Sequence, residues 1–144
     1  MQALWREIDD LHAALAPDYF RTAARGAPEW RQLLAAPDGA LFVATSGAAG
    51  EPLHGAVSVR IYDTPPDPAM VPRRRGHVEK LVVSRAHRRR GLGRALMAEA
   101  SAWARQQGAV ELVLTVWAGN AEAEAFYRSL GYRVLSSVLH TPLG

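Results

Sequence analysis

The sequence predicts a mixed α/β fold, in which helices cover a central β-sheet. Short runs of β-branched and aromatic residues lie between turn signals, and longer segments repeat their apolar residues at helical spacing. The predicted order is helix, helix, strand, strand, strand, helix, strand, helix, strand. A right-handed crossover would make the third and fourth strands parallel neighbours. At 144 residues we expect a single domain over residues 1–144.

The individual elements follow from local patterns. Helices are predicted over 3–15, 27–36, 91–107 and 121–130, and strands over 41–44, 53–62, 77–84, 110–117 and 133–140. Pro17 ends the first helix, because its ring cannot continue the hydrogen-bonding pattern. Gly108 and Gly131 end the last two helices. The segment from Asp63 to Gly76 contains four prolines, which predicts a long loop.

Composition excludes several classes of function. The chain has no cysteine, so disulfides, thiolate metal sites and a cysteine nucleophile are absent. No stretch approaches the ~20 consecutive apolar residues of a membrane span, and charges interrupt the first ten residues, where a signal peptide would be apolar. We therefore expect a cytoplasmic protein with no membrane partner.

Positive charge is concentrated in one part of the chain. Residues 73–94 carry nine basic residues and one acidic residue, a local charge of +8, whereas the rest of the chain carries −5. Such a local field suits a compact polyanionic ligand.

The stretch from Glu79 to Met97 reads as a strand, a turn rich in arginine and glycine, and the start of a helix. The first N–H groups of a helix are unpaired, and Gly91 and Gly93 would let an anion approach them closely. A dinucleotide fingerprint fails because position 96 is Leu, and no Gly-x-x-x-x-Gly-Lys-Ser/Thr motif is present. His77-Val78-Glu79 resembles half of a zinc deaminase signature, but the required cysteines are missing, so we expect no metal site.

Two motifs together resemble the GNAT superfamily of N-acetyltransferases. The first is Arg88-x-x-Gly91-x-Gly93 after an apolar strand, and the second is Asn120 followed by Phe126-Tyr127-Arg128-Ser129-Leu130-Gly131-Tyr132. The resemblance spans roughly residues 40–140. It implies a single-domain GNAT fold, with a mixed central β-sheet flanked by about four helices, and acetyl-CoA as co-substrate without a metal. The chain departs from the family in that the first strand is apparently missing or very short.

The resemblance also implies a set of cofactor-binding residues. These are Leu81, Val82, Val83, Arg88, Arg89, Arg90, Gly91, Leu92, Gly93, Arg94, Asn120 and Tyr127. The turn would hold the pyrophosphate of coenzyme A, and the strand would pair with the pantetheine amides. A backbone N–H near Leu81 or Val82 would polarise the acetyl carbonyl. The alternatives are a solvated basic turn for the arginines, a plain core strand for residues 81–83, and a simple helix cap for Asn120.

Two side chains are candidates for catalysis. The motif places Tyr127 as the acid that protonates the departing thiolate, and Glu79 stands where many members carry a carboxylate, as the general base. His77 and Tyr62 are the alternative bases. The ordinary interpretations are a core tyrosine for Tyr127 and an arginine-paired strand residue for Glu79.

The resemblance implies direct transfer of an acetyl group from acetyl-CoA to a primary amine, carried by a small molecule or a peptide. A non-catalytic acyl-CoA-binding domain is the alternative. Nucleic-acid binding through the arginine triplets ranks last, since no aromatic residues are interleaved with them. A homodimer is one possible assembly, and the sequence does not identify the amine acceptor.

Overall fold

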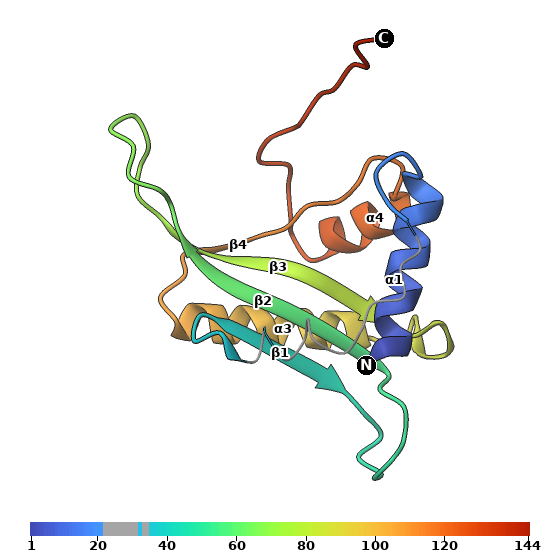
Figure 1. The fold of residues 1–144 in the computed structure, drawn as a ribbon. Helices are drawn as coiled ribbons and strands as arrows, with labels where there is room; N and C mark the ends of the chain where they lie inside the picture. Colours follow the sequence, from blue (N-terminus) through green and yellow to red (C-terminus); the bar gives the residue numbers. More distant parts are fainter. Residues whose placement is uncertain (22–31, 33–34) are drawn as a thin grey trace.

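The protein folds around one four-stranded sheet, seen in the computed structural model in Figure 1. The structure describes residues 1–21, 32 and 35–144. Its elements are α1 (Gln2–Leu15), β1 (Gly39–Ala44), β2 (Gly55–Asp63), β3 (Arg74–Val83), the 3-10 turn η1 (Arg85–His87), α3 (Leu92–Gln106), β4 (Glu111–Val113) and α4 (Ala121–Ser129). The predicted helix over 27–36 lies mostly outside the described residues.

The sheet is mixed and its strands lie in sequence order. Strands β1, β2 and β3 pair antiparallel, and β3 pairs parallel with β4 through α3. This confirms the predicted mixed α/β class, including the parallel pairing of the third and fourth strands.

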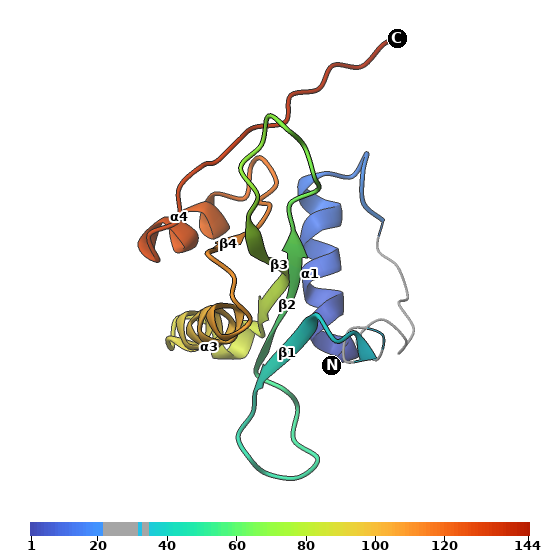
Figure 2. The ribbon, with the colours of Figure 1, turned by 90° about the vertical axis from the view of Figure 1, so that its left-hand side faces the viewer.

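Helices cover both faces of the sheet. Figure 2 shows α1 on one face, and α3 and α4 on the other. On the α3 face, Val57, Val59 and Val78 pack with Leu96 and Met97 in a buried cluster. A second cluster joins residues of α1 to the opposite face of β2 and β3; its buried members are Leu4, Trp5, Ala56 and Val82. Strand β2 is buried along most of its length because helices cover both faces of the sheet.

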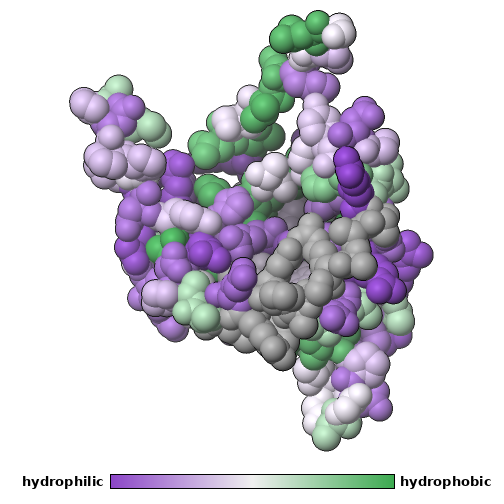
Figure 3. All heavy atoms as spheres, in the orientation of Figure 1, coloured by the Kyte–Doolittle hydropathy of each residue, from purple (hydrophilic) through white to green (hydrophobic). Residues whose placement is uncertain are grey.

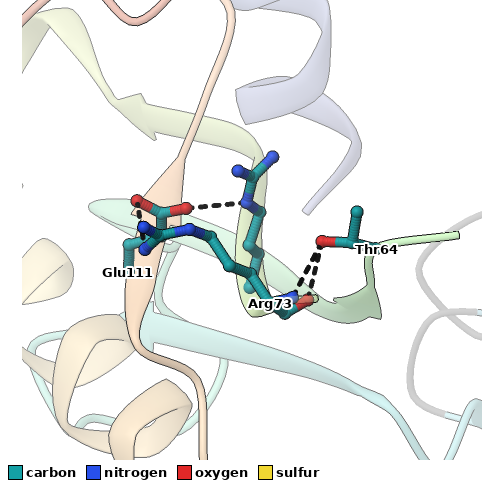
Figure 4. A network of polar contacts seen from close by, with 4 residues as sticks. Thr64, Arg73 and Glu111 are labelled. Carbon is teal, nitrogen blue, oxygen red and sulfur yellow. Dashed lines mark hydrogen bonds and ion pairs between the residues drawn. The ribbon is translucent and has the colours of Figure 1, made fainter. Parts of the chain in front are cut away.

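The predicted long loop is shorter than expected. Strand β2 continues to Asp63 and β3 already begins at Arg74, so the connection spans residues 64–73. The hydroxyl of Thr64 donates to the carbonyl of Arg73 at 2.9 Å, and the backbone N–H of Arg73 donates back to that hydroxyl at 3.1 Å. Arg74 bonds Asp63 at 2.8 Å. These contacts extend the hairpin as far as the segment that holds the prolines; Figure 4 shows the Thr64–Arg73 bonds.

Two of the predicted strands were wrong: one is shorter than predicted, and the other is not formed. The predicted strand 110–117 is a strand only from Glu111 to Val113, because the chain then turns away from β3. The predicted closing strand 133–140 is not formed; this segment is extended and exposed, and pairs with no strand of the described chain. No helix in the described part of the chain is long and apolar enough to cross a membrane.

Candidate active site

Strand β3 is paired on both sides for only part of its length. Its pairing with β4 runs from Arg75 to His77, while its pairing with β2 continues to Val83. The β4 side of residues 79–83 therefore faces no strand of the described chain. The chain after β4 diverges from β3, which leaves an opening along the second half of β3 (Figure 1).

The hydrogen bonds between β3 and the neighbouring chain show which backbone amides face this opening. The N–H of Ser84 donates to the carbonyl of His54 at 2.9 Å, so Ser84 points its amide toward the β2 side. Along a strand, the backbone N–H and C=O groups of successive residues point to opposite sides. Those of Val82 therefore point toward β2, and those of Leu81 and Val83 point into the opening. The Val83 carbonyl agrees with this direction, because it accepts a bond from the Arg88 side chain at 3.1 Å.

The side chains of the same three residues belong to the core. Leu81 and Val83 pack on the cluster of the α3 face, and Val82 is buried against α1. The core-strand interpretation therefore holds for their side chains, and only their backbone can serve the opening.

The turn after β3 has the backbone shape of an anion cradle. Arg89 has φ of +61° and Gly91 has φ of +80°, and α3 begins at Leu92 with no side chain capping its first N–H groups. A Cβ added at Gly91 would meet nothing within 4 Å. Unpaired N–H groups at the start of a helix can donate hydrogen bonds to an anion.

Gly93 has a packing role in this structure, and its part in phosphate binding stays a prediction. A Cβ at this position would lie 3.2 Å from the ring of Phe126 in α4. Gly93 therefore allows α3 and α4 to approach each other closely. The sequence could not separate this packing role from a phosphate-binding one.

The side chains of the four arginines in and just after this turn, Arg88, Arg89, Arg90 and Arg94, point in different directions. Arg88 turns back toward the body, with its guanidinium 3.7 Å from Glu7 of α1. Arg89 is fully exposed and lies 4.0 Å from Glu122, and Arg94 reaches Ser129 at 3.5 Å. Arg90 is exposed. Arg89 and Arg90 are the members best placed to meet a ligand from solvent.

The other arginine triplet, Arg73 to Arg75, contacts two carboxylates. Arg75 bonds Glu111 at 2.7 Å and Arg73 lies 4.0 Å from the same carboxylate, while Arg74 bonds Asp63. Figure 4 shows the contacts of Glu111 with Arg73 and with a second arginine, beside the connection 64–73. The segment after β3 holds five of the nine basic residues of 73–94, and two of these five, Arg88 and Arg89, also lie near a carboxylate.

Asn120 is a helix cap. Its side-chain oxygen accepts from the N–H of Ala123 at 3.1 Å, at the start of α4. Asn and the acidic residues Glu122 and Glu124 in the first turn both favour this helix start. The capping role is shown, and a contact with the cofactor stays a prediction.

Tyr127 packs in the same cluster as Leu81 and Val83, which brings α4 next to the open half of β3. Its ring contacts those of Phe126 and Tyr132, with centroids 5.2 and 5.6 Å apart. Burial, with a smaller contribution from Tyr132, raises the pKa of Tyr127 to about 12. The phenol is therefore protonated throughout the physiological range.

Glu79 lies at an irregularity of β3. The register with β2 pairs Lys80 with Ser58 and Val78 with Val59, so Glu79 is the extra residue of a β-bulge. Its carboxylate lies 3.3 Å from Nε of Arg60 and accepts from the hydroxyl of Tyr62 at 3.5 Å. The arginine-paired interpretation is thus correct for this structure.

The two alternative bases gather beside Glu79. The rings of Tyr62 and His77 meet edge to face at 6.0 Å. Burial first, and the Glu79 carboxylate second, raise the pKa of Tyr62. Glu79, Tyr62 and His77 therefore form one polar group on the sheet.

Two arrangements near the site were not predicted from the sequence. The rings of His54 and His87 stack 3.7 Å apart beneath the turn after β3, and His87 also bonds Ser84 at 2.7 Å. Trp117 packs against Phe20 and Tyr19, at 4.7 and 5.3 Å between ring centroids. Contacts between residues so distant in the chain leave no signal in the spacing of a single sequence.

Among the described residues, no set of three or more His, Asp or Glu side chains could hold an ion.

Comparison with known families decides what this arrangement is. The model of the acetyltransferase (GNAT) family matches residues 5–132. The chain belongs to the GNAT family. The match includes both motifs and all the predicted site residues, and it stops at the start of the segment that forms no strand. A search of curated proteins found no sequence that matches this GNAT chain.

Solved structures share the GNAT fold at low sequence identity. A mutant of the BH1408 protein from Bacillus halodurans is 22% identical, with a TM-score of 0.90 over 99% of this chain and 90% of that one. A putative acetyl transferase from Pyrococcus furiosus is 23% identical, with a TM-score of 0.67 over 99% and 95%. The aminoglycoside N-acetyltransferase AAC(6')-Iy, solved in complex with CoA, is 20% identical, with a TM-score of 0.68 over 80% and 83%. At these identities the likeness concerns the fold alone.

Proposed function

We propose that this GNAT chain is an acetyl-CoA-dependent N-acetyltransferase that transfers the acetyl group directly to a primary amine. One observation carries the proposal: β3 separates from β4 after His77 and continues, unpaired on that side, to a turn with positive φ angles and an uncapped helix. A strand edge of free amides followed by an anion cradle fits a ligand that has amide groups in its arm and a pyrophosphate at its end.

The residues present fit coenzyme A. The amide groups of Leu81 and Val83, which point into the opening, would pair with the pantetheine arm. The N–H groups from Arg89 to Arg94 would hold the pyrophosphate, with the exposed guanidinium groups of Arg89 and Arg90 adding charge. When bound, acetyl-CoA supplies an activated thioester.

The direction of the backbone amides in β3 favours one N–H as the group that would polarise the thioester carbonyl. The sequence left Leu81 and Val82 as alternatives. The bond from Ser84 to His54 turns Val82 toward β2, which favours the N–H of Leu81 for this role.

Tyr127 would act as a hydrogen-bond donor toward the thiolate. A phenol with a pKa of about 12 is a weaker acid than a thiol near ~8.5, so complete proton transfer would be uphill by roughly 5 kcal/mol. A shared proton that stabilises the developing charge does not carry this cost in full. The thiol would then take its final proton from the solvent or from the amine.

Glu79 would attract the ammonium form of the acceptor and take its proton, directly or through a water molecule. The bulge at Glu79 turns its carboxylate to the α1 face beside Tyr62 and His77. In this structure the carboxylate already lies 3.3 Å from Nε of Arg60, so it is not placed to meet the amine alone. A relay through a neighbouring group therefore belongs to the proposal.

Binding is tested first, by calorimetry with acetyl-CoA on the unmodified chain and on Gly91→Val. The substitution places a side chain in the cradle at φ +80°, and we expect at least a 10-fold weaker affinity. Gly50→Val is the matched control, because Gly50 has φ +83° and equally open surroundings, but lies in the β1–β2 connection. Equal effects of the two substitutions, or no heat with the unmodified chain, would refute the proposed cofactor site.

Turnover is tested by thiol release over a panel of primary amines. With a working amine, Glu79→Gln should lower kcat/KM about 10–100-fold while coenzyme A still binds. An active Glu79→Gln together with an inactive His77→Gln would move the base to His77. Binding of acetyl-CoA without release for any amine would favour the non-catalytic acyl-CoA-binding alternative.

A further inference from the structure

Lys80 is the single lysine of this chain. The sequence holds 17 lysine and arginine residues, and all of them except Lys80 are arginines. A guanidinium group stays protonated in proteins, whereas the amine of a lysine can lose a proton and form a covalent bond to a carbonyl carbon. Lys80 is therefore the only side chain of the sequence that carries a primary amine, the group that an N-acetyltransferase modifies.

Lys80 stands between the two residues that have the main roles in the proposed reaction. Glu79 precedes it, and Leu81, whose N–H would polarise the thioester carbonyl, follows it. That N–H belongs to the peptide bond between Lys80 and Leu81, so a thioester held there would lie directly beside Lys80. A lysine side chain has a flexible stem of four carbons, which allows its amine to reach a group bound at the neighbouring amide.

The side chain of Lys80 lies on the α1 face of the sheet, the face to which the bulge turns Glu79. Lys80 pairs with Ser58 of β2, and its ammonium nitrogen is 5.1 Å from the ring centroid of Trp5 in α1. Figure 3, viewed from this side, shows mainly hydrophilic residues around the sheet. Lys80 is half-buried, so part of its side chain remains accessible.

The contact with Trp5 does not by itself explain a lysine at this position. An arginine makes the same cation–π contact, and proteins use arginine for it more often. This chain has arginine at every other basic position, including Arg60, which lies on the neighbouring strand beside Glu79. A lysine in this one place therefore points to a role that requires its amine.

We propose that the chain acetylates its own Lys80 with acetyl-CoA as the donor, an inference that rests on the proposed function because it uses the same cofactor site. The deprotonated amine attacks the thioester carbon, a C–N bond forms, and the C–S bond breaks. Of the two protons that the ammonium group gives up, one converts the departing thiolate to the free thiol, and the other leaves through Glu79 or water to the solvent. The product is a neutral amide, so the positive charge over Trp5 is lost.

Mass spectrometry of the unsubstituted chain incubated with acetyl-CoA, without an added amine, tests the inference. We expect one acetyl group per chain, located at Lys80 by fragmentation. Lys80→Arg keeps a positive charge over Trp5 but has no amine, so its acetylation should be at least about 10-fold slower. An unmodified Lys80, or an acetyl group carried by the amine of Met1 in its place, would overturn the proposal.

A second comparison separates transfer within the site from spontaneous acylation of an accessible amine. Gly91→Val retains Lys80 but obstructs the proposed cradle, so acetylation of Lys80 should become at least about 10-fold slower. Gly50→Val, with φ +83° and equally open surroundings, should be acetylated as fast as the unsubstituted chain. In a mixture of Gly91→Val and Lys80→Arg, the Lys80 of the first should stay unmodified, because each chain modifies itself. Equal rates in the two glycine variants, or modification in the mixture, would overturn the proposal.

Calorimetry with acetyl-CoA distinguishes a failure of this inference from a failure of the proposed function. A chain that binds acetyl-CoA and releases thiol with an added amine, but leaves Lys80 unmodified, would overturn self-acetylation alone. A chain that binds no acetyl-CoA would overturn both. Acetylation of Lys80 that depends on the cradle, without turnover of any added amine, would support this inference and would leave Lys80 as the acceptor.

Discussion

The two halves of β3 are built for different purposes. The first half, Arg74–Val78, lies between β2 and β4, and its two arginines form ion pairs with neighbouring carboxylates; we call it the closed half. The second half, Glu79–Val83, has β2 on one side and an opening on the other, and we call it the open half. The change occurs at Glu79, where a bulge interrupts the register. One strand therefore supplies a rigid base and, directly after it, a free backbone edge. Substitutions in the first half should change stability, and those around the second half should change activity.

The largest effect is expected at Tyr127, beside the open half. Tyr127→Phe removes the hydroxyl but keeps the ring, so kcat should fall about 100-fold or more while the affinity for acetyl-CoA changes little. Tyr132→Phe is the matched control, since its ring lies in the same cluster. Steady-state kinetics with a working amine measures both. Equal loss of kcat in the two variants would assign Tyr127 to packing.

The next effect is expected in the closed half, at Gly76. A Cβ there would lie 2.5 Å from Leu112 and 3.0 Å from Ala104, so Gly76→Ala should lower the free energy of unfolding by about 2 kcal/mol. Gly93→Ala, beside the open half, meets only the ring of Phe126 at 3.2 Å and gains helix propensity, so its cost should be smaller. Urea unfolding compares them, and a larger loss for Gly93→Ala would break the distinction.

Glu111 ties β4 to the closed half. Glu111→Gln removes a charge that bonds half-buried Arg75 at 2.7 Å, and it should destabilise the fold by about 1–2 kcal/mol. Glu124→Gln is the control, because its ion pair with Arg128 is much more exposed and should contribute less than about 0.5 kcal/mol. Equal midpoints of thermal unfolding for the two variants would show that the Arg75 pair adds nothing to the closed half.

The smallest effect concerns alkaline pH. Burial raises the folded-state pKa of Tyr127 to about 12, whereas an unfolded chain titrates near ~10. Because the folded value is the higher one, this stabilisation is complete below pH ~10 and is lost as the pH rises toward 12, by roughly 1 kcal/mol at pH 11. Tyr62 and Tyr132 shift in the same direction, so the informative quantity is the difference between the unmodified chain and Tyr127→Phe. That difference should narrow between pH 9 and pH 11, measured by thermal unfolding; a constant difference would contradict the buried phenol.

The sequence determined the elements whose signals are local. Apolar periodicity predicted α1 and α3, β-branched runs predicted β1 to β3, and Asn120 with its acidic neighbours marked the start of α4. The motif around Gly91 and the unit ending at Tyr132 indicated the GNAT family, because both depend on residue identities at fixed spacing. These features depend on interactions within a few turns of chain.

Only the tertiary structure decided how the site is divided. The separation of β4 from β3 after Val113, the bulge at Glu79 and the close approach of Phe126 to Gly93 each depend on contacts between distant segments. The same reason explains the wrong closing strand. Residues 133–140 have the composition of a strand, but a strand forms only where the segment lies against a sheet edge, and here it pairs with no strand of the described chain. Local propensity thus specified a strand, and the course of the chain after α4 decided that it is not formed.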